Sequence, residues 1–198
     1  MARPREFDRD VALERARDAF WSRGYEGTSM ADLVAALGLA SARIYAAFGS
    51  KEELFREAIA LYQAKEGGFG ARALDEEPTA QQAFARTMRE AVDLYTRPGK
   101  PHGCMVVTAA TTCAAENEPI QEWLAQVRRQ RTAAIIERLK RAVREGELKR
   151  ETDVQALGDY LSTVLNGLSV QARDGVPRKR LHALGNLALE TLAQNRAR

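Results

Sequence analysis

The first fifty residues are divided into short segments by three glycines, Gly24, Gly38 and Gly49. This spacing constrains the fold more than any other feature of the sequence, because glycine ends helices by adopting left-handed backbone angles without a steric penalty. In the first segment, residues 8–23, Ala12, Ala16 and Phe20 fall on one face of a helix. The sequence therefore predicts several short helices that pack against one another to bury their apolar faces.

Residues that cap helices follow these glycines. Thr28 or Ser29 can cap a helix over residues 30–37, and another short helix follows over 41–48. After the third glycine, a Ser-Lys-Glu-Glu capping box opens a longer helix over 51–66. We therefore expect four helices by residue 66.

The rest of the chain also has helical periodicity. Loops are predicted at the glycine-rich residues 67–70 and at 75–78, where acidic residues precede a proline. Residues 104–115 mix strand-favouring and helix-favouring side chains, and we assign a helix because no second strand-like run exists to pair with a strand. The predicted later helices cover residues 79–96, 104–115, 119–145, 153–173 and 178–195. The sequence thus predicts an all-α fold.

Composition excludes several classes of protein. Of 198 residues, 45% are apolar and 29% are charged, which is the ordinary balance of a globular protein. We find no apolar run long enough for a signal peptide or a membrane span. Two cysteines, Cys104 and Cys113, are too few for a disulfide framework or a zinc finger. We expect a cytoplasmic protein with no membrane partner and no metal site.

The charge balance sets a condition on any anionic partner. The net charge is +3, but residues 1–60 hold nine basic and ten acidic side chains. Proteins are attracted to nucleic acids mainly through the phosphates, so binding by this segment requires its basic groups to gather on one face. Arg3 and Arg5 precede the first helix and fit either an arm that contacts DNA or a solvated tail.

The two short helices on either side of Gly38 have the spacing of a helix-turn-helix. Leu33, Leu37, Leu39 and Ile44 stand where the two helices need apolar residues to pack against each other. The face left exposed on the second helix comprises Ser41, Ala42, Arg43, Tyr45 and Ala46. An arginine there can bond a guanine edge, a tyrosine can donate to a phosphate, and alanines allow close approach to bases. A helical hairpin with a solvated arginine fits the spacing equally well.

Further motifs follow one another in a dense order. They are Ala19-Phe20, Gly24-Tyr25-Glu26-Gly27-Thr28-Ser29, Ala31-Asp32-Leu33-Val34, Leu37-Gly38-Leu39, Ile44-Tyr45, Phe48 and Gly49-Ser50-Lys51-Glu52-Glu53-Leu54-Phe55. In this order and spacing, residues 10–60 resemble the DNA-binding domain of the TetR family of bacterial transcriptional repressors. Val34, Arg43 and Gly49 depart from the residues that the family more often has. The resemblance implies that the major groove is faced by Ser41, Ala42, Arg43 and Ala46, and that phosphates are held by Thr28, Tyr45 and Lys51.

The resemblance implies a DNA-binding transcriptional regulator rather than an enzyme. Such a protein is a repressor that binds a palindromic operator in double-stranded DNA as a homodimer and is released by a small-molecule effector, with no cofactor. The implied domains are a helix-turn-helix domain over residues 1–50, a connecting helix over 51–66, and a regulatory and dimerisation domain over 51–198. The residues agree, because we find only two histidines and no phosphate-binding loop or nucleophile motif.

The resemblance also implies that helices between about residues 55 and 145 enclose the effector. Aromatic and apolar side chains with a few hydroxyl groups are typical of such cavities. The predicted lining is Tyr62, Phe69, Phe84, Met88, Tyr95, Cys104, Met105, Thr108, Thr111, Trp123 and Val127. Taken alone, each of these residues also suits a packed core. Because few acids lie at these positions, an apolar or anionic compound fits better than a polycation.

The long helix over residues 119–145 carries a basic run interleaved with apolar residues. The run comprises Arg128, Arg129, Arg131, Arg138, Lys140, Arg141 and Arg144. Such a pattern is typical of a solvated helix face.

The last two helices each carry a wide apolar face, which predicts a four-helix interface with a second copy of the chain. The predicted contacts are Leu157, Tyr160, Leu161, Val164, Leu168, Leu181, Leu184 and Ala188. The alternative is that these faces pack within one chain.

Cys104, Cys113 and His102 form the one cluster of soft metal ligands that the sequence offers. If residues 104–115 are one helix, the two sulfurs lie on opposite faces and about 13 Å apart along the axis, which is too far for a disulfide or a shared metal. We expect unpaired cysteines, with Cys104 the more reactive because it lies at a helix N-terminus. The alternative functions are a thiol- or metal-responsive regulator acting through Cys104 and a helical small-molecule binding protein.

Overall fold

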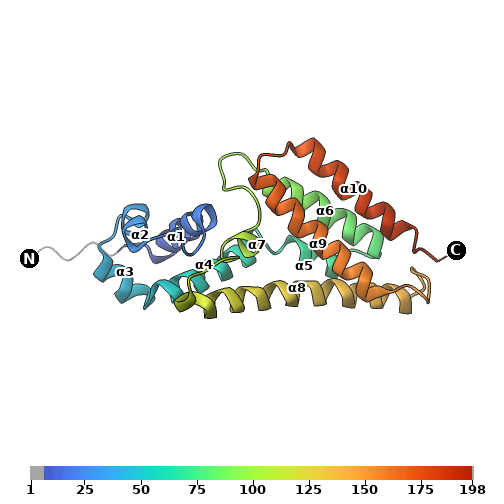
Figure 1. Cartoon of the computed structure of the whole chain (residues 1–198), viewed down its shortest axis with the longest axis horizontal. Coiled ribbons are helices and arrows are strands. Elements are labelled where there is room, and N and C mark those ends of the chain that lie inside the picture. Colours follow the sequence, from blue (N-terminus) through green and yellow to red (C-terminus); the bar gives the residue numbers. More distant parts are fainter. Residues whose placement is uncertain (1–6, 198) are drawn as a thin grey trace, which may run out of the picture.

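The computed structural model describes residues 7–197, and within this range every regular element is a helix (Figure 1). The elements are α1 (Arg9–Arg23), α2 (Met30–Leu37), α3 (Ser41–Phe48), α4 (Lys51–Lys65), α5 (Phe69–Glu76), α6 (Ala80–Tyr95), α7 (Met105–Thr108), the 3-10 helix η1 (Ala115–Asn117), α8 (Glu118–Arg144), α9 (Val154–Arg173) and α10 (Arg178–Ala193). Extended backbone pairs only in an isolated antiparallel bridge between Leu148 and Arg196 in this range. The predicted all-α fold is confirmed.

Side-chain caps and glycines set the ends of the first helices. Asp8 accepts hydrogen bonds from two backbone N–H groups in the first turn of α1. Ser29 and Asp32 form a reciprocal capping box on α2. Gly38 ends α2 in the left-handed conformation, with φ of 70°, and α3 leaves at 91° to α2. The helices α2 and α3 have the predicted bounds.

The start of α4 closes the core of these three helices. Phe20 of α1 packs edge-on against Phe55 of α4, with ring centroids 5.1 Å apart. One residue further along α1, Trp21 packs against Tyr62 at 4.8 Å. All four side chains are fully buried, and burial of such large apolar groups contributes on the order of 1.5–3 kcal/mol each. The core therefore fixes α4 to the N-terminal helices.

The remaining helices form an elongated body that continues away from the N-terminal unit (Figure 1). The longest helix, α8, has 27 residues and runs along the long axis of the molecule beneath α4 and α5. The helices α6, α9 and α10 pack against one another over the far half of α8, and α5 packs against α6. Along the chain, α4 connects the N-terminal unit to the body.

Residues 69–76 form a helix, whereas the sequence prediction placed loops at 67–70 and 75–78 and no helix between them. The turn after α4 brings the backbone of Gly67 against the ring of Tyr62, where only glycine fits because a Cβ would be 2.3 Å from Tyr62 Cε1. Beyond this turn, α5 buries Phe69 and Ala73. A two-turn helix is marginal on its own, so packing against α6 stabilises α5.

The predicted helix over residues 104–115 is wrong beyond its first turn. The helix α7 covers only Met105–Thr108, and turns then lead to η1. The carbonyl of Ala109 accepts a hydrogen bond from the backbone N–H of Tyr25 at 2.7 Å, where a continuing helix would offer it to Cys113. Contact with the N-terminal unit thus overrides local helix propensity.

Across residues 7–197, we find no single helix that is both long and apolar enough to cross a membrane. The helices α2 and α3 meet that test only when taken together, and they are bent sharply at Gly38. The predicted arm residues Arg3 and Arg5 lie outside the described residues.

Candidate functional site

Helix α3 exposes the five residues that the sequence predicts on its outer face. Ile44 and Phe48 turn inward and are 2% and 4% exposed. The exposed residues are Ser41, Ala42, Arg43, Tyr45 and Ala46. Most of these side chains are small, so the helix can approach another surface closely. The face has the size and polarity that suit the major groove of DNA.

Most basic side chains of the N-terminal helices are paired with carboxylates. The pairs are Arg9–Glu57, Arg17–Asp18, Arg17–Glu66, Arg23–Asp32 and Arg56–Glu52. Among the cations of residues 7–60, Arg15, Arg43 and Lys51 have no carboxylate of residues 7–197 within 4.0 Å. Arg43 lies on α3 and Lys51 begins α4. Two of these three cations therefore lie beside the exposed face of α3, whereas Arg15 on α1 donates to the carbonyl of Leu37 at 3.3 Å.

Lys51 stands in the first turn of α4. Ser50 caps this helix by accepting a hydrogen bond from the N–H of Glu53, and the free N–H groups of the first turn favour an anion. The Lys51 ammonium lies 4.2 Å from the centre of the Tyr25 ring. Burial there lowers the pKa of Lys51, while Glu26 acts in the opposite direction. Helix end and ammonium together can hold a phosphate.

Thr28 does not lie where a phosphate contact requires. Its side chain is fully buried, and its hydroxyl donates a hydrogen bond to the carbonyl of Gly24 at 2.7 Å. The hydroxyl therefore holds the turn between α1 and α2 together. The structure contradicts the prediction of a phosphate contact at Thr28, because a hydroxyl at a helix N-terminus was taken to be exposed.

Residues 109–117 dock onto the turn between α1 and α2. The carboxylate of Glu26 accepts hydrogen bonds from the N–H of Ala114 and from Asn117 Nδ2, each at 2.9 Å. These bonds, that from Asn117 above all, hold the pKa of Glu26 below its usual value. The docked segment leads directly into α8. Glu26 thus ties the turn of the N-terminal unit to the start of the longest helix.

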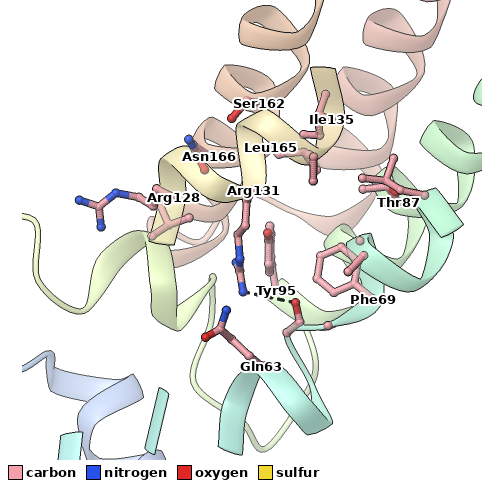
Figure 2. A pocket seen from close by; sticks show the side chains of 17 residues that line it. Gln63, Phe69, Thr87, Tyr95, Arg128, Arg131, Ile135, Ser162, Leu165 and Asn166 are labelled. Carbon is pink, nitrogen blue, oxygen red and sulfur yellow. Dashed lines mark hydrogen bonds between the residues drawn. The ribbon is translucent and has the colours of Figure 1, made fainter. Parts of the chain in front are cut away.

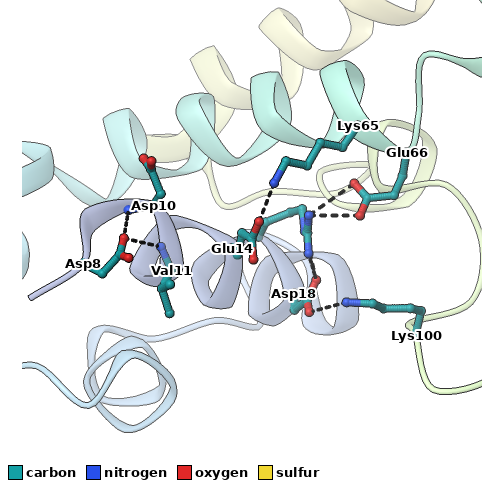
Figure 3. A network of polar contacts seen from close by, with 9 residues as sticks. Asp8, Asp10, Val11, Glu14, Asp18, Lys65, Glu66 and Lys100 are labelled. Atoms are coloured by element: carbon teal, nitrogen blue, oxygen red, sulfur yellow. Dashed lines mark hydrogen bonds and ion pairs between the residues drawn. The ribbon is translucent and has the colours of Figure 1, made fainter.

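A network of ion pairs fixes α1 to α4 and to the loop before α7 (Figure 3). Arg17 is 3% exposed and pairs with Glu66 at 3.0 Å and with Asp18 at 2.8 Å. Asp18 also pairs with Lys100 at 2.9 Å. Because removal of one partner from a buried ion pair is strongly destabilising, this network holds the C-terminal end of α4 in a defined place relative to α1.

The body contains a partly open cavity of about 240 Å³ between the end of α4 and the helices α5, α6, α8 and α9 (Figure 2). Its lining comprises Gln63, Gly67, Gly68, Phe69, Gly70, Ala71, Leu74, Thr87, Tyr95, Val107, Arg128, Arg131, Ala134, Ile135, Ser162, Leu165 and Asn166. Apolar walls with a few polar groups are typical of small-molecule sites, whose usual volumes begin at about 300 Å³. The cavity suits a small ligand.

Two residues of the predicted lining, Phe69 and Tyr95, face this cavity. Tyr62 and Cys104 lie behind it, with the phenol of Tyr62 donating to Cys104 Sγ at 3.4 Å. The other predicted residues lie outside the lining: Phe84, Met88 and Met105 in the packed core, Val127 against it, Thr108 beside Arg173, Thr111 at the surface and Trp123 beneath Arg56. These positions correct the prediction, because apolar periodicity does not distinguish a cavity wall from a core.

The sequence prediction missed the polar wall of the cavity. Ser162 and Asn166 come from α9, which was assigned to dimerisation, and Arg131 comes from the basic run on α8. This run is not a uniformly solvated face, because Arg131 lines the cavity and Arg138 is 4% exposed and pairs with Glu147 at 3.2 Å. The sequence signal that could have indicated this polar wall is the position of Arg131 at the boundary of the apolar face of its helix.

The predicted interface residues on α9 and α10 fall into two sets. Those buried within the chain are Leu157, Leu161, Leu168, Leu181 and Ala188. They hold the two helices against the body, which corrects their assignment to an interface. Tyr160 and Leu184 are exposed, Val164 is partly buried, and Val170 and Leu187 are exposed as well. We call these five residues the outer apolar face.

The two cysteines are unpaired and lie in different surroundings. Cys104 is 1% exposed, whereas Cys113 is partly exposed beside Glu26 and Lys51. Burial and the neighbouring Glu26 raise the pKa of the Cys113 thiol. The buried position of Cys104 contradicts the prediction that it is the more reactive thiol. Residues 7–197 contain no group of three His, Cys, Asp or Glu side chains placed to hold a metal.

Two family models match this chain. The model described as bacterial regulatory proteins, tetR family, covers residues 12–58. The model described as tetracyclin repressor-like, C-terminal domain, covers residues 80–184, which is more than half of the chain. The chain belongs to the TetR family. The resemblance noted in the sequence is thereby confirmed.

Three TetR-type regulators are similar over nearly the whole chain. The TetR family transcriptional regulator CifR, solved as a cysteine mutant complexed with 26-bp double-strand operator DNA, is 45% identical with a TM-score of 0.91, and the match covers 96% of this chain and 98% of that one. The HTH-type transcriptional repressor ComR of Escherichia coli K12 is 31% identical over 94% of this chain and 90% of its own length. The HTH-type transcriptional repressor BdcR of the same organism is 27% identical over 96% and 91%.

Membership of the TetR family makes this chain a DNA-binding transcriptional regulator and not an enzyme. Its architecture is the family's: an N-terminal helix-turn-helix followed by a helical C-terminal domain. The similarities do not favour the alternative functions, a thiol- or metal-responsive regulator or a binding protein without DNA.

Proposed function

We propose that this TetR-family chain is a repressor that binds a roughly palindromic site in double-stranded DNA as a homodimer and leaves it when a small molecule binds the body. The outer face of α3 carries the proposal, because small side chains there surround an arginine with no carboxylate partner in residues 7–197. The operator-bound structure of CifR and the repressor names of ComR and BdcR support it.

In this proposal the residues of the DNA face have two kinds of role. Arg43 bonds a base edge, and Ser41, Ala42 and Ala46 allow α3 to enter the major groove. Tyr45 and Lys51 hold phosphates on either side and set the register of the helix without reading sequence. Specificity therefore depends on few side chains.

A second copy of the chain covers the outer apolar face of α9 and α10. Val170, Leu184 and Leu187 are 46%, 44% and 55% exposed in the single chain, and contiguous apolar patches on a protein surface mark interaction sites. Pairing α9 and α10 with their symmetry mates gives a four-helix interface. Such a dimer presents two α3 helices to successive major grooves, about 34 Å apart.

An effector in the cavity weakens DNA binding by favouring another spacing of the two α3 helices. The cavity touches the end of α4, and the neighbouring Glu66 holds Arg17 of α1. Coupling between two sites is reciprocal. A compound that releases DNA must therefore bind less tightly to the DNA complex than to the free protein by the same factor, and equal affinities would exclude that compound as an effector.

We place the DNA-binding domain at residues 1–50 and the regulatory and dimerisation domain at 51–198, with α4 as the connection. Supporting this division, α4 contributes Phe55 to the N-terminal core and lines the cavity of the body with Gln63. A movement at one end of α4 is therefore transmitted to the other end.

Selection of genomic DNA fragments by the purified protein tests the proposed function. Fragments from the source genome are bound, recovered and sequenced, with Arg43→Ala as the control protein. We expect the wild-type protein to enrich an inverted repeat and the variant to enrich it less. Equal recovery of all fragments by the wild-type protein would contradict a sequence-specific repressor.

A further inference from the structure

The cavity contains a cation without an ionic partner. Arg131 extends from α8 into the space between Gln63 and Tyr95 (Figure 2). Its guanidinium has two long contacts, to Cys104 Sγ at 3.5 Å and to the carbonyl of Gly67 at 3.4 Å. We find no carboxylate within 4.0 Å of Arg131 in the part of the chain that the structure describes. An arginine stays charged in proteins, so this charge is held in a largely apolar site with weak compensation.

The two phenols and the amide beside this guanidinium supply no counter-charge. Burial raises the pKa of the Tyr62 and Tyr95 phenols well above their usual value, so both stay neutral at physiological pH. The amide of Gln63 is uncharged. Arg128, the second arginine of the lining, points away from the cavity (Figure 2) and donates to the carbonyl of Val106 at 3.0 Å. The positive potential of the cavity is therefore centred on Arg131.

We propose that this cavity binds a small organic carboxylate whose charged end pairs with Arg131 and whose hydrocarbon body lies against Phe69, Ile135 and Leu165. The regulatory part of this inference rests on the proposed function, but the binding itself does not. A guanidinium matches a carboxylate with two parallel hydrogen bonds, and a buried charge gains most from an ionic partner. A volume of 240 Å³ equals the space of about eight water molecules, which suits an acid of roughly ten non-hydrogen atoms or fewer.

Carboxylate binding also changes the contact between Arg131 and the end of α4. The carbonyl that Arg131 contacts belongs to Gly67, and the preceding residue, Glu66, holds the buried Arg17 of α1. A carboxylate competes with that carbonyl for the same N–H groups. Binding therefore weakens the attachment of α8 to the end of α4, next to the ion pair that positions the DNA-binding unit.

Calorimetric titration of octanoate into the purified full-length protein without DNA tests the ligand class. Octan-1-ol and octylamine are length-matched controls, and hexanoate tests a shorter acid. We expect at least one of the two acids to bind once per chain and at least ten times more tightly than either control. Equal binding of acid, alcohol and amine, or no binding of either acid, would overturn the inference.

Two substitutions on α8 test the role of Arg131. Arg131→Met removes the charge and keeps an apolar side chain, and we expect at least a tenfold loss of affinity for the acid with octanol binding unchanged. Arg129→Met is the matched control, because Arg129 is exposed and pairs with Glu122 outside the cavity; we expect wild-type affinity. An unchanged affinity of Arg131→Met for the acid would refute the assignment.

Arg131→Lys separates charge from folding. A lysine keeps the charge but lacks the planar fork, so we expect a partial preference for the acid over the alcohol and a melting temperature close to that of the wild type. No preference in a folded Arg131→Lys protein would count against an ionic contact. The DNA affinity of the wild-type protein is measured separately. If the wild type binds DNA but not the acid, this inference alone is rejected. If the wild type does not bind DNA, the proposed function is rejected.

Discussion

At the scale of single residues, neither Arg43 nor Lys51 has a carboxylate partner in residues 7–197, but the two differ in what they can reach. Arg43 projects from the outer face of α3, so its fork can meet a base edge. We expect Arg43→Ala to weaken binding to the selected site by about 1–3 kcal/mol and to remove the preference at one base pair per half-site. Fluorescence anisotropy on the site and on its single-base variants measures both effects. Unchanged affinity and preference would exclude Arg43 from base contact.

Lys51 stands at a helix end beside Tyr25, where a phosphate fits better than a base. Lys51→Ala should therefore weaken binding to all sequences alike and reduce the slope of log affinity against log salt by about 1 for each chain. Titrations at several salt concentrations, on the selected site and on unrelated DNA, check this. A changed base preference would show that the roles of Lys51 and Arg43 are misassigned.

Thr28 illustrates a residue whose pattern suits DNA binding but whose environment does not. Thr28→Val keeps the shape of the side chain and leaves the carbonyl of Gly24 without its hydrogen bond. We expect a loss of about 1–3 kcal/mol in the free energy of unfolding, measured by urea denaturation. Thr28→Ser, which keeps the hydroxyl, should lose less. If Thr28→Val keeps full stability but binds DNA more weakly, the original prediction of a phosphate contact at Thr28 would be supported.

At the scale of elements, local signals were sufficient where local contacts decide. The ends of α2 follow from the Ser29 cap and from Gly38, and the end of α3 follows from Gly49; all three are visible in the sequence. The helix α5 and the early end of α7 were not predictable in this way, because they depend on residues distant in the chain. The backbone N–H of Tyr25 donates a hydrogen bond to the carbonyl of Ala109 and so ends α7 early. Packing against α6 stabilises α5.

The parts of the candidate site also differ in whether local signals in the sequence predict them. The outer face of α3 could be predicted because helical periodicity separates it from Ile44 and Phe48. The cavity could not, because five distant segments form it and its charged residue, Arg131, stands in a basic run. The apolar residues of α9 and α10 that are buried within the chain and those that are exposed follow the same helical periodicity. The sequence therefore does not distinguish them.

The docking of residues 109–117 onto the N-terminal unit should depend on pH through Glu26. Its pKa is lowered in the folded protein, so its stabilising contribution is complete above the unfolded value of about 4.3 and is lost as the pH falls through the folded value. We expect wild type to be more stable to urea than Glu26→Gln at pH 7, with the difference reduced at pH 3. Glu116→Gln, exposed on the same segment, is the control. A difference independent of pH would contradict an ionised Glu26 in this contact.

At the scale of the whole molecule, the outer apolar face stays exposed in a single chain. Leu184→Glu places a charge in the proposed interface and should convert the dimer to a monomer in sedimentation experiments. Val11→Glu, an equally exposed position on α1 at 43% against 44%, is the matched control and should leave the mass unchanged. If the Leu184→Glu protein is still a dimer, the interface lies elsewhere on the surface.

The central claim is that two copies of this chain present α3 to successive major grooves of one DNA site. Hydroxyl-radical footprinting of the selected fragment, combined with the mass of the complex by sedimentation, measures this directly. We expect two chains on the site and two protected patches related by two-fold symmetry, with centres about 34 Å apart along the duplex. One chain on the site, or a single protected patch without symmetry, would contradict the account.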